Sequence, residues 1–221
     1  MDFTNPYFPA WFSFFTNGVS LVLVLLVIAS LVRSFKQKAH LLNPWLWCIF
    51  LVACMWLLRA SLASGINMHL SGAMLMTLMF GWRLGFLGMC LVIVSTCFFN
   101  DALFINLGVS VLLNALLPVT LLYSIFLLLE AKLPRHFFIY IFGSAFFGTW
   151  VTSMTMGFIT ALYLLVFGAF EWSLLRQQFL PYYFLMGFSE SFLTTGLITL
   201  FVVYRPAWVY SFRDQRYLDG K

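Results

Sequence analysis

Residues 19–32 read VSLVLVLLVIASLV, an apolar run without a single charged side chain. A helix needs about 20 mostly apolar residues to cross the roughly 30 Å hydrocarbon core of a bilayer. The apolar character extends back to Trp11, and Arg33 ends it. Residues 11–32 are therefore predicted to form a transmembrane helix.

The remainder of the 221-residue chain has the same character. Hydrophobic residues make up 63% of it and charged residues only 9%, too few to cover the surface of a soluble globule. The 27 Phe, 8 Trp and 9 Tyr suit helices that face lipid. We therefore predict an all-α integral membrane protein, with one transmembrane domain over residues 1–221. The basic residues lie singly between apolar spans, which argues against nucleic acid as a partner.

Cutting the chain at charges, prolines and polar clusters gives about seven predicted spans. They cover residues 11–32, 44–63, 68–82, 84–99, 105–130, 137–168 and 178–204. The third and fourth are short and meet at the sequence GWRLG (81–85), where a tight turn or a close helix contact is possible. Pro118 removes a backbone donor and predicts a kink in the fifth span.

The distribution of Lys and Arg predicts the orientation. With the N-terminus outside, the cytoplasmic side receives Arg33, Lys36, Lys38, Arg83, Lys132, Arg135, Arg205, Arg213, Arg216 and Lys221. Only Arg59 and Arg176 remain outside. The C-terminus is then cytoplasmic. The start of the chain, MDFTNP, is acidic and no cleavage site follows the first apolar run, so we expect it to be retained.

Polar side chains in this apolar background are the candidates for function. Asp2, His69, Asn100 and Asp101 fall at the outer side, together with the amine of Met1. An imidazole at position 69 is suited either to bind a metal ion or to cap a helix. Asp2 and Asp101, taken singly, also fit a solvated terminal residue and a turn residue.

Glu190 lies inside the seventh predicted span, where a carboxylate must be protonated, hydrogen-bonded or paired. Three roles are open to it: cross-linking helices, taking part in a conduction path, or binding an ion.

Motifs of catalysis are missing from the sequence. It contains no GxSxG, no HExxH and no phosphate-binding loop, so an enzyme is not expected. Cys48, Cys54, Cys90 and Cys97 lie inside apolar runs without CxxC spacing, and we expect buried, inert thiols. An intramembrane oxidoreductase would rest on the aromatic residues and scattered cysteines alone.

Two motifs with their order and spacing resemble a known family. Residues 69–75 (HLSGAML) and 99–108 (FNDALFINLG) resemble motifs of the metal-capturing membrane subunit, the CbiM/NikM-type S component of cobalt and nickel energy-coupling-factor (ECF) transporters. A helix with Glu190 followed by Arg205 and Pro206, and the opening Met1-Asp2-Phe3, resemble further parts of that family.

The resemblance implies a function and a site. The chain would be the substrate-capture subunit of an ECF transporter for a divalent transition metal, in the bacterial cytoplasmic membrane, with a transmembrane coupling subunit and ATPases as partners. Met1, Asp2 and His69 would bind the metal, and Asn100 and Asp101 would support the loop around it. Asp2 stands where the family has His; its carboxylate closes a chelate ring of the same size but is a harder ligand.

A second hypothesis follows from the same replacement. The chain would be a relative that kept the fold, lost metal transport and acts as an interaction or assembly subunit in the membrane.

Overall fold

The computed structural model describes residues 9–32, 40–58, 60–61, 67–98, 102–167, 170–212 and 217. The α-helices are α1 (Ala10–Val32), α2 (Leu42–Leu57), α3 (Ala73–Cys97), α4 (Ala102–Ile105), α5 (Leu107–Val111), α6 (Leu117–Lys132), α7 (Gly148–Val166), α8 (Trp172–Leu174) and α9 (Leu180–Tyr204). The π-helical segments η2 (Leu112–Leu116), η3 (Ile139–Phe147) and η4 (Leu175–Phe179) lead into α6, α7 and α9, and η5 (Pro206–Trp208) is a short 3-10 helix. Strand β1 (Ala60–Ser61) pairs antiparallel with β2 (Asn67–Met68).

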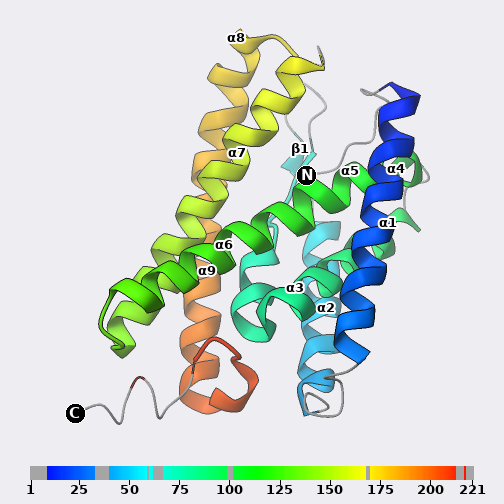
Figure 1. Cartoon of the computed structure of the whole chain (residues 1–221). Helices are drawn as coiled ribbons and strands as arrows, with labels where there is room; N and C mark the ends of the chain where they lie inside the picture. The colour runs from blue at the N-terminus through cyan, green and yellow to red at the C-terminus, as the bar shows by residue number, and fades with distance from the viewer. Residues whose placement is uncertain are drawn as a thin grey trace.

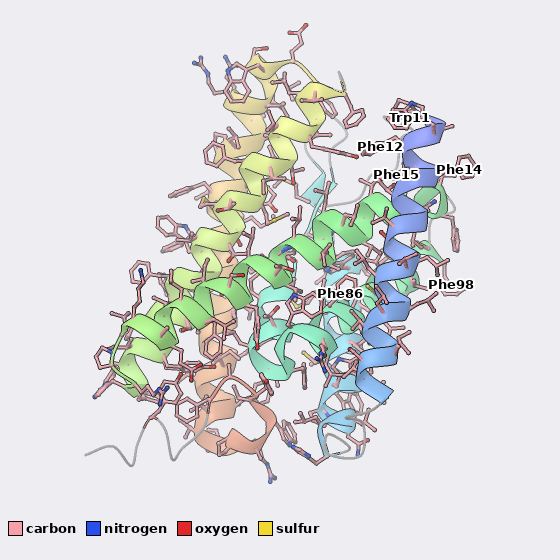
Figure 2. The ribbon with its side chains drawn as sticks, in the orientation of Figure 1. Trp11, Phe12, Phe14, Phe15, Phe86 and Phe98 are labelled. Carbon is pink, nitrogen blue, oxygen red and sulfur yellow. The ribbon has the colours of Figure 1, made fainter. Side chains whose placement is uncertain are left out.

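The described helices have the length and the surface of membrane-spanning helices. Five helical runs are long and apolar enough to cross a bilayer: Ala10–Leu31, Ala73–Cys97, Leu107–Lys132, Ile139–Val166 and Trp172–Tyr204. Trp11, Phe14, Phe15 and Phe98 are each at least 64% exposed, whereas Phe86 on α3 is fully buried (Figure 2). Such an outer surface requires lipid as its solvent. The prediction of an all-α integral membrane protein is confirmed.

The number of long helices differs from the seven predicted spans for two reasons. Helix α2 has only 16 residues, shorter than the five spanning candidates. The predicted third and fourth spans form one element, α3, which is kinked at Gly81. The two halves of α3 pack closely, because a Cβ on Gly85 would lie 3.1 Å from the Cα of Thr77. The small residues at 81 and 85 therefore serve both a turn and a close helix contact.

The kink in α3 is built from a glycine and the chain segment after α9. Gly81 has φ 76° and ψ 178°, a conformation open essentially only to glycine. The break exposes carbonyl groups, and the backbone N–H groups of Tyr210 and Ser211 donate to the carbonyls of Met79 and Leu78 at 2.8 and 3.2 Å. The Tyr210 ring lies against Gly81, 2.7 Å from where a Cβ would be. The segment after α9 thus satisfies the backbone of the broken helix.

Two prolines follow π-helical segments. Pro118 lies in the first turn of α6, directly after η2, and Pro181 lies in the first turn of α9, directly after η4. Proline has no N–H to donate to the preceding turn, and a π-helical turn is one known way for a helix to adapt. The predicted distortion at Pro118 therefore takes the form of a widened turn before the proline.

The ends of the elements separate into two sides of the molecule (Figure 1). The start of α1, the β1–β2 pair, α4 and α8 lie toward the upper side, and the end of α1, the start of α2, the end of α6 and η5 lie toward the lower side. Lys132, at the end of α6, and Arg205, after α9, belong to the lower side, as expected for residues assigned to the cytoplasm. The outside location of the N-terminus stays a prediction.

Helix α3 forms the centre of the packing. It contacts α2 on one side and α6 on another, while α7 packs along α9 and α1 packs against α5 (Figure 1). Met76, Phe80, Phe86 and Met89 of α3 are all fully buried. The loop that leads into α3 is therefore held by several helices at once.

The cysteines follow the prediction with one exception. Cys48, Cys90 and Cys97 are buried, but Cys54 on α2 is exposed on the outer surface of the helix bundle. The prediction was wrong for Cys54 because an apolar run in a membrane protein can face lipid as well as the interior.

Candidate functional site

The loop of residues 69–72, between β2 and α3, begins with the predicted site residue His69. Its side chain is buried, with 4% of its surface exposed. The ring of Trp56, at the end of α2, lies against the imidazole with a centroid distance of 4.0 Å and a tilt of 41°. The imidazole Nδ1 is 3.2 Å from the carbonyl oxygen of Leu70. The plane of the imidazole is thus fixed by an aromatic contact and a backbone contact.

Trp56 also holds the loop through its indole N–H. Nε1 donates to the carbonyl oxygen of Ser71 at 2.9 Å, and the Trp56 side chain is 1% exposed. One side chain therefore contacts both the imidazole of His69 and the backbone two residues further along.

Glu190 fixes the other end of the loop. The backbone N–H of Gly72 donates to its Oε1 at 2.8 Å, and the Glu190 side chain is 3% exposed. Gly72 precedes the first turn of α3, where free backbone N–H groups favour a carboxylate. The hydrogen bond joins α9 to the start of α3. Of the three roles open to Glu190, cross-linking of helices is the one that this hydrogen bond supplies.

The conformation of Gly72 requires glycine. Its φ is 71°, in the left-handed region, and a Cβ would lie 2.8 Å from Cγ1 of Val52 on α2. The backbone of the loop consequently approaches α2 more closely than any other residue type permits.

A small cavity of about 10 Å³ lies beside His69, roughly the space of one water molecule. It is lined by Met68, His69, Ser71, Met74, Leu113, Asn114, Pro118, Met156, Tyr183 and Met186. These residues come from β2, the loop, α3, η2, α6, α7 and α9, so the cavity marks the point where most of the bundle converges.

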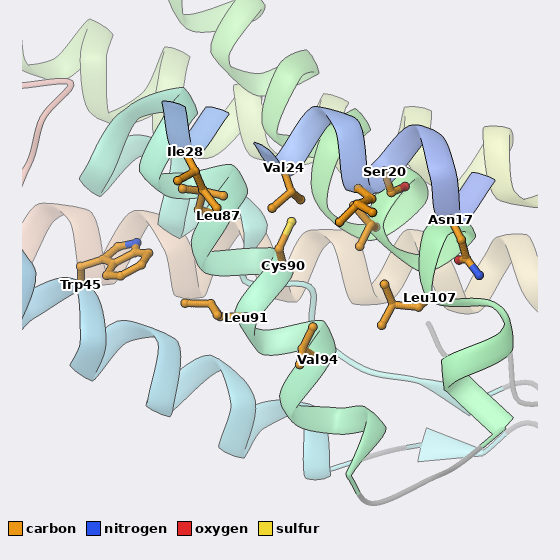
Figure 3. A pocket seen from close by; sticks show the side chains of 12 residues that line it. Asn17, Ser20, Val24, Ile28, Trp45, Leu87, Cys90, Leu91, Val94 and Leu107 are labelled. Atoms are coloured by element: carbon orange, nitrogen blue, oxygen red, sulfur yellow. The ribbon is translucent and has the colours of Figure 1, made fainter. Parts of the chain in front are cut away.

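A larger cavity of about 420 Å³ lies between α1, α2, α3 and α5 (Figure 3). Its walls are almost entirely apolar, with Leu21, Val24, Leu87 and Leu91 among them. A metal ion needs oxygen, nitrogen or sulfur ligands to replace its water shell. The described walls of this cavity therefore offer few ligands for a metal ion, although Cys90 points into it (Figure 3).

The start of α1 is tied to the segment around α4 and α5 by polar residues that sequence reasoning missed. The hydroxyl of Ser13 donates to Oδ1 of Asn106 at 3.1 Å, and the side-chain oxygen Oδ1 of Asn17 accepts a hydrogen bond from the backbone N–H of Gly108. A Cβ on Gly108 would lie 2.3 Å from the backbone of Thr16, so the two elements touch through their main chains. An Asn in each of two apolar segments was the available signal.

Of the predicted site residues, the structure brings His69 and Glu190 to the two ends of one loop. Met1, Asp2, Asn100 and Asp101 lie outside the described residues. Within the part of the chain that the structure describes, no three His, Cys, Asp or Glu side chains form a metal-binding group.

Comparison with known proteins agrees with this architecture. The chain matches the family CbiM, described as the cobalt uptake substrate-specific transmembrane region, over residues 4–208. Two solved structures, described as a truncated transition metal transporter and a transition metal transporter, each superpose with a TM-score of 0.73 at 15% identity. The match covers 92% of this chain and 98% of the first structure, and 90% and 92% for the second. No curated protein matches the chain.

The family match over residues 4–208 makes this helical membrane protein a membrane component of metal uptake. The chain belongs to the CbiM family. The family is described as a transport region and not as a class of enzyme. At 15% identity, the likeness to the two solved structures shows the fold.

Proposed function

We propose that this chain is the substrate-capture subunit of an ECF transporter that takes up a divalent transition metal of the cobalt and nickel class. Membership of the CbiM family supports a transition metal as the substrate. The sequence contains no phosphate-binding loop, so the energy comes from separate ATPases through a transmembrane coupling subunit. The expected location is the cytoplasmic membrane of a bacterium.

The imidazole of His69 carries most of this proposal. A buried histidine held by Trp56 on one face, with its loop braced by Glu190, presents one nitrogen in a fixed direction. Preorganised ligands bind metal more tightly because less conformational freedom is lost on binding. The rigid loop therefore supplies one strong ligand, and the remaining ligands come from the start of the chain.

Met1 and Asp2 are the proposed partners of His69. The terminal amine, the amide nitrogen of residue 2 and the Asp2 carboxylate form a chelating set, with the imidazole as a further ligand. The carboxylate in place of a second imidazole adds negative charge and hardness, so the preference for nickel and cobalt over other divalent ions is expected to be weaker. Asn100 and Asp101 are proposed to support the loop that faces this set.

Metal titration tests the proposal. Purified protein in detergent is titrated with nickel(II), cobalt(II) and zinc(II), and one ion is expected to bind per chain. His69→Ala is expected to weaken the affinity at least by the roughly 10- to 100-fold that loss of a supporting residue already costs. His136→Ala, beyond the end of α6, is the matched control and should leave the affinity unchanged. Equal affinities in the wild type and the His69→Ala variant would overturn the assignment.

The replacement of His by Asp at position 2 favours a second candidate function. A chain that kept the fold but lost transport would act as an assembly subunit in the membrane. Protein isolated without added metal separates the two: stoichiometric bound metal argues for transport, and metal-free protein that does not respond to titration argues for assembly.

A further inference from the structure

The larger cavity, of about 420 Å³, opens sideways between α1 and α3 toward the lipid. Leu21 and Ile28 of α1 and Leu91 and Val94 of α3 line its walls and are also exposed on the outer surface of the helix bundle. Cys90, further inside, is buried and faces the same space (Figure 3). The cavity is therefore continuous with the surface that the fold presents to the bilayer.

The polar groups in the walls are already bonded within the protein. Among the described lining residues, Asn17, Ser20 and Trp45 supply all the side-chain nitrogen and oxygen atoms. Both amide atoms of Asn17 are hydrogen-bonded to backbone groups of α4 and α5. The Ser20 hydroxyl donates to the carbonyl of Gly108 at 3.1 Å, and the indole N–H of Trp45 donates to the carbonyl of Leu84 at 2.9 Å. The cavity thus favours a ligand that is hydrocarbon where it is enclosed.

The length of the cavity matches the depth of one leaflet. Its walls on α1 extend from Asn17 to Ile28, and eleven residues of helix rise by about 16 Å. Half of the roughly 30 Å hydrocarbon core is about 15 Å. Trp45, in the first turn of α2, lies at the Ile28 end, and tryptophan is enriched where the hydrocarbon meets the headgroups (Figure 3). The Ile28 end therefore faces the interface on the side where α1 ends.

The volume of the cavity favours a slender occupant over a helix of another protein. A helix with side chains is at least about 10 Å across, so roughly 1,200 Å³ would be needed to seat it over this length. The cavity, at about 420 Å³, holds much less. An empty space of this size would also forgo the contacts that lipid chains at its mouth are able to make with the walls.

We propose that this cavity is a binding site for one acyl chain of a phospholipid, from the leaflet in which α1 ends. The chain lies between α1 and α2 over residues 87–94 of α3. It is held more firmly than the lipid around the protein, because several helices enclose it and an exposed helix face offers contact on one side only. The inference does not rest on the proposed function, and metal binding does not enter its test.

Photo-leucine, a leucine analogue with a photoreactive diazirine, identifies the occupant. Protein that carries it is purified in detergent and washed until exposed lipid has exchanged, and is then irradiated. Mass spectrometry is expected to find phospholipid attached at Leu87 and Leu107, which line the cavity. Leu25 and Leu26, exposed on the outer face of α1, should carry detergent. Detergent at all four positions would overturn the proposal.

Irradiation of the same protein in its native membrane tests the other occupants. Phospholipid is again expected at Leu87 and Leu107. A second copy of the chain, or another polypeptide, attached at these two positions in place of phospholipid would overturn the proposal.

A matched pair of variants tests whether the enclosed space is what holds the lipid. Val24→Trp fills part of the cavity, whereas Val22→Trp makes the same change on the exposed face of α1. Loss of the seat for about two methylene groups corresponds to roughly tenfold weaker binding. The phospholipid adduct at Leu87 in washed protein should fall about tenfold in Val24→Trp relative to Val22→Trp. Equal adducts in the two folded variants would overturn the proposal, and the wild-type adducts decide it if Val24→Trp does not fold.

Thermal unfolding gives a second readout of the same site. Phosphatidylethanolamine added to the detergent-washed protein should raise the unfolding midpoint of the wild type and of Val22→Trp, because a ligand of the folded state stabilises it. The rise should be smaller in Val24→Trp. An equal rise in both variants would show that the lipid acts at the outer surface and would overturn the proposal.

Discussion

The carboxylate of Glu190 and the backbone N–H of Gly72 are 118 residues apart in the chain and form a buried hydrogen bond of 2.8 Å. Through this bond, α9 fixes the point where the His69 loop becomes α3. The left-handed conformation of Gly72 makes the N–H available in that direction. The position of the candidate metal ligand therefore depends on a helix near the C-terminal end of the chain.

Removal of the Glu190 carboxylate is expected to destabilise the protein. Glu190→Ala leaves the buried N–H of Gly72 without its acceptor, at a cost of about 1–3 kcal/mol in the free energy of unfolding. Glu190→Gln keeps an oxygen acceptor and should lose less. Equilibrium unfolding in detergent measures both, and a Glu190→Ala variant as stable as the wild type would contradict the bracing role.

Gly72→Ala is expected to strain the same loop. An L-residue in the left-handed region loses about 1–2 kcal/mol, and the added methyl also meets Val52. Gly18→Ala is the matched control, because a Cβ there has no neighbour within 4 Å. The free energy of unfolding should fall for Gly72→Ala and not for Gly18→Ala. The affinity for nickel(II) should also fall in Gly72→Ala, because the His69 loop must move. A Gly72→Ala protein with unchanged stability and unchanged nickel(II) affinity would be inconsistent with the described loop.

Substitutions of Trp56 separate its two contacts. Trp56→Phe keeps a ring beside His69 but loses the N–H that donates to Ser71, which is expected to remove about 0.5–1.5 kcal/mol of stability. Trp56→Ala also loses the packing of a fully buried aromatic side chain, about 3–5 kcal/mol. Trp47→Phe, on the exposed face of α2, serves as the control. Thermal unfolding should show the smallest loss of stability for Trp47→Phe, a larger loss for Trp56→Phe and the largest loss for Trp56→Ala. Equal losses of stability in Trp56→Phe and Trp47→Phe would exclude a role for the indole N–H.

The kink at Gly81 provides a test of the link between α3 and the segment after α9. Gly81→Ala places a methyl group against Tyr210 in a backbone conformation that costs of order 1–3 kcal/mol for other residues. Gly196→Ala, on the open side of α9, is the control. Limited proteolysis with chymotrypsin after Tyr210, whose backbone N–H is bonded to the kinked helix, should become faster in Gly81→Ala only. Unchanged cleavage would show that Tyr210 does not depend on the kink.

Sequence alone predicted most of the spans within a few residues. Residues 11–32 correspond to α1 (Ala10–Val32), and 178–204 ends with α9 at Tyr204. These boundaries are set by where apolar residues give way to charge, which is a local property. Helix α2 ends at Leu57, earlier than the predicted residue 63, because the chain turns into β1. That ending comes from pairing with β2, which apolar character does not reveal.

The candidate site was only partly predictable for a similar reason. His69 and Glu190 were selected because polar groups are rare in apolar spans, yet nothing local pairs Glu190 with Gly72. The roles of Trp56, Asn17 and Asn106 depend on contacts between distant helices. The residues around the larger cavity look like ordinary apolar residues in the sequence, and only the fold gathers them.

The most direct test of the central claim is nickel(II) titration of protein that begins at Met1 and of protein with one glycine added before it. The added residue moves the free amine away from Asp2 and leaves the helices unchanged, which equal unfolding curves would verify. Our account predicts that the extended protein loses nickel binding to the same degree as His69→Ala. Undiminished binding in the extended, folded protein would contradict a site shared by the chain start and His69.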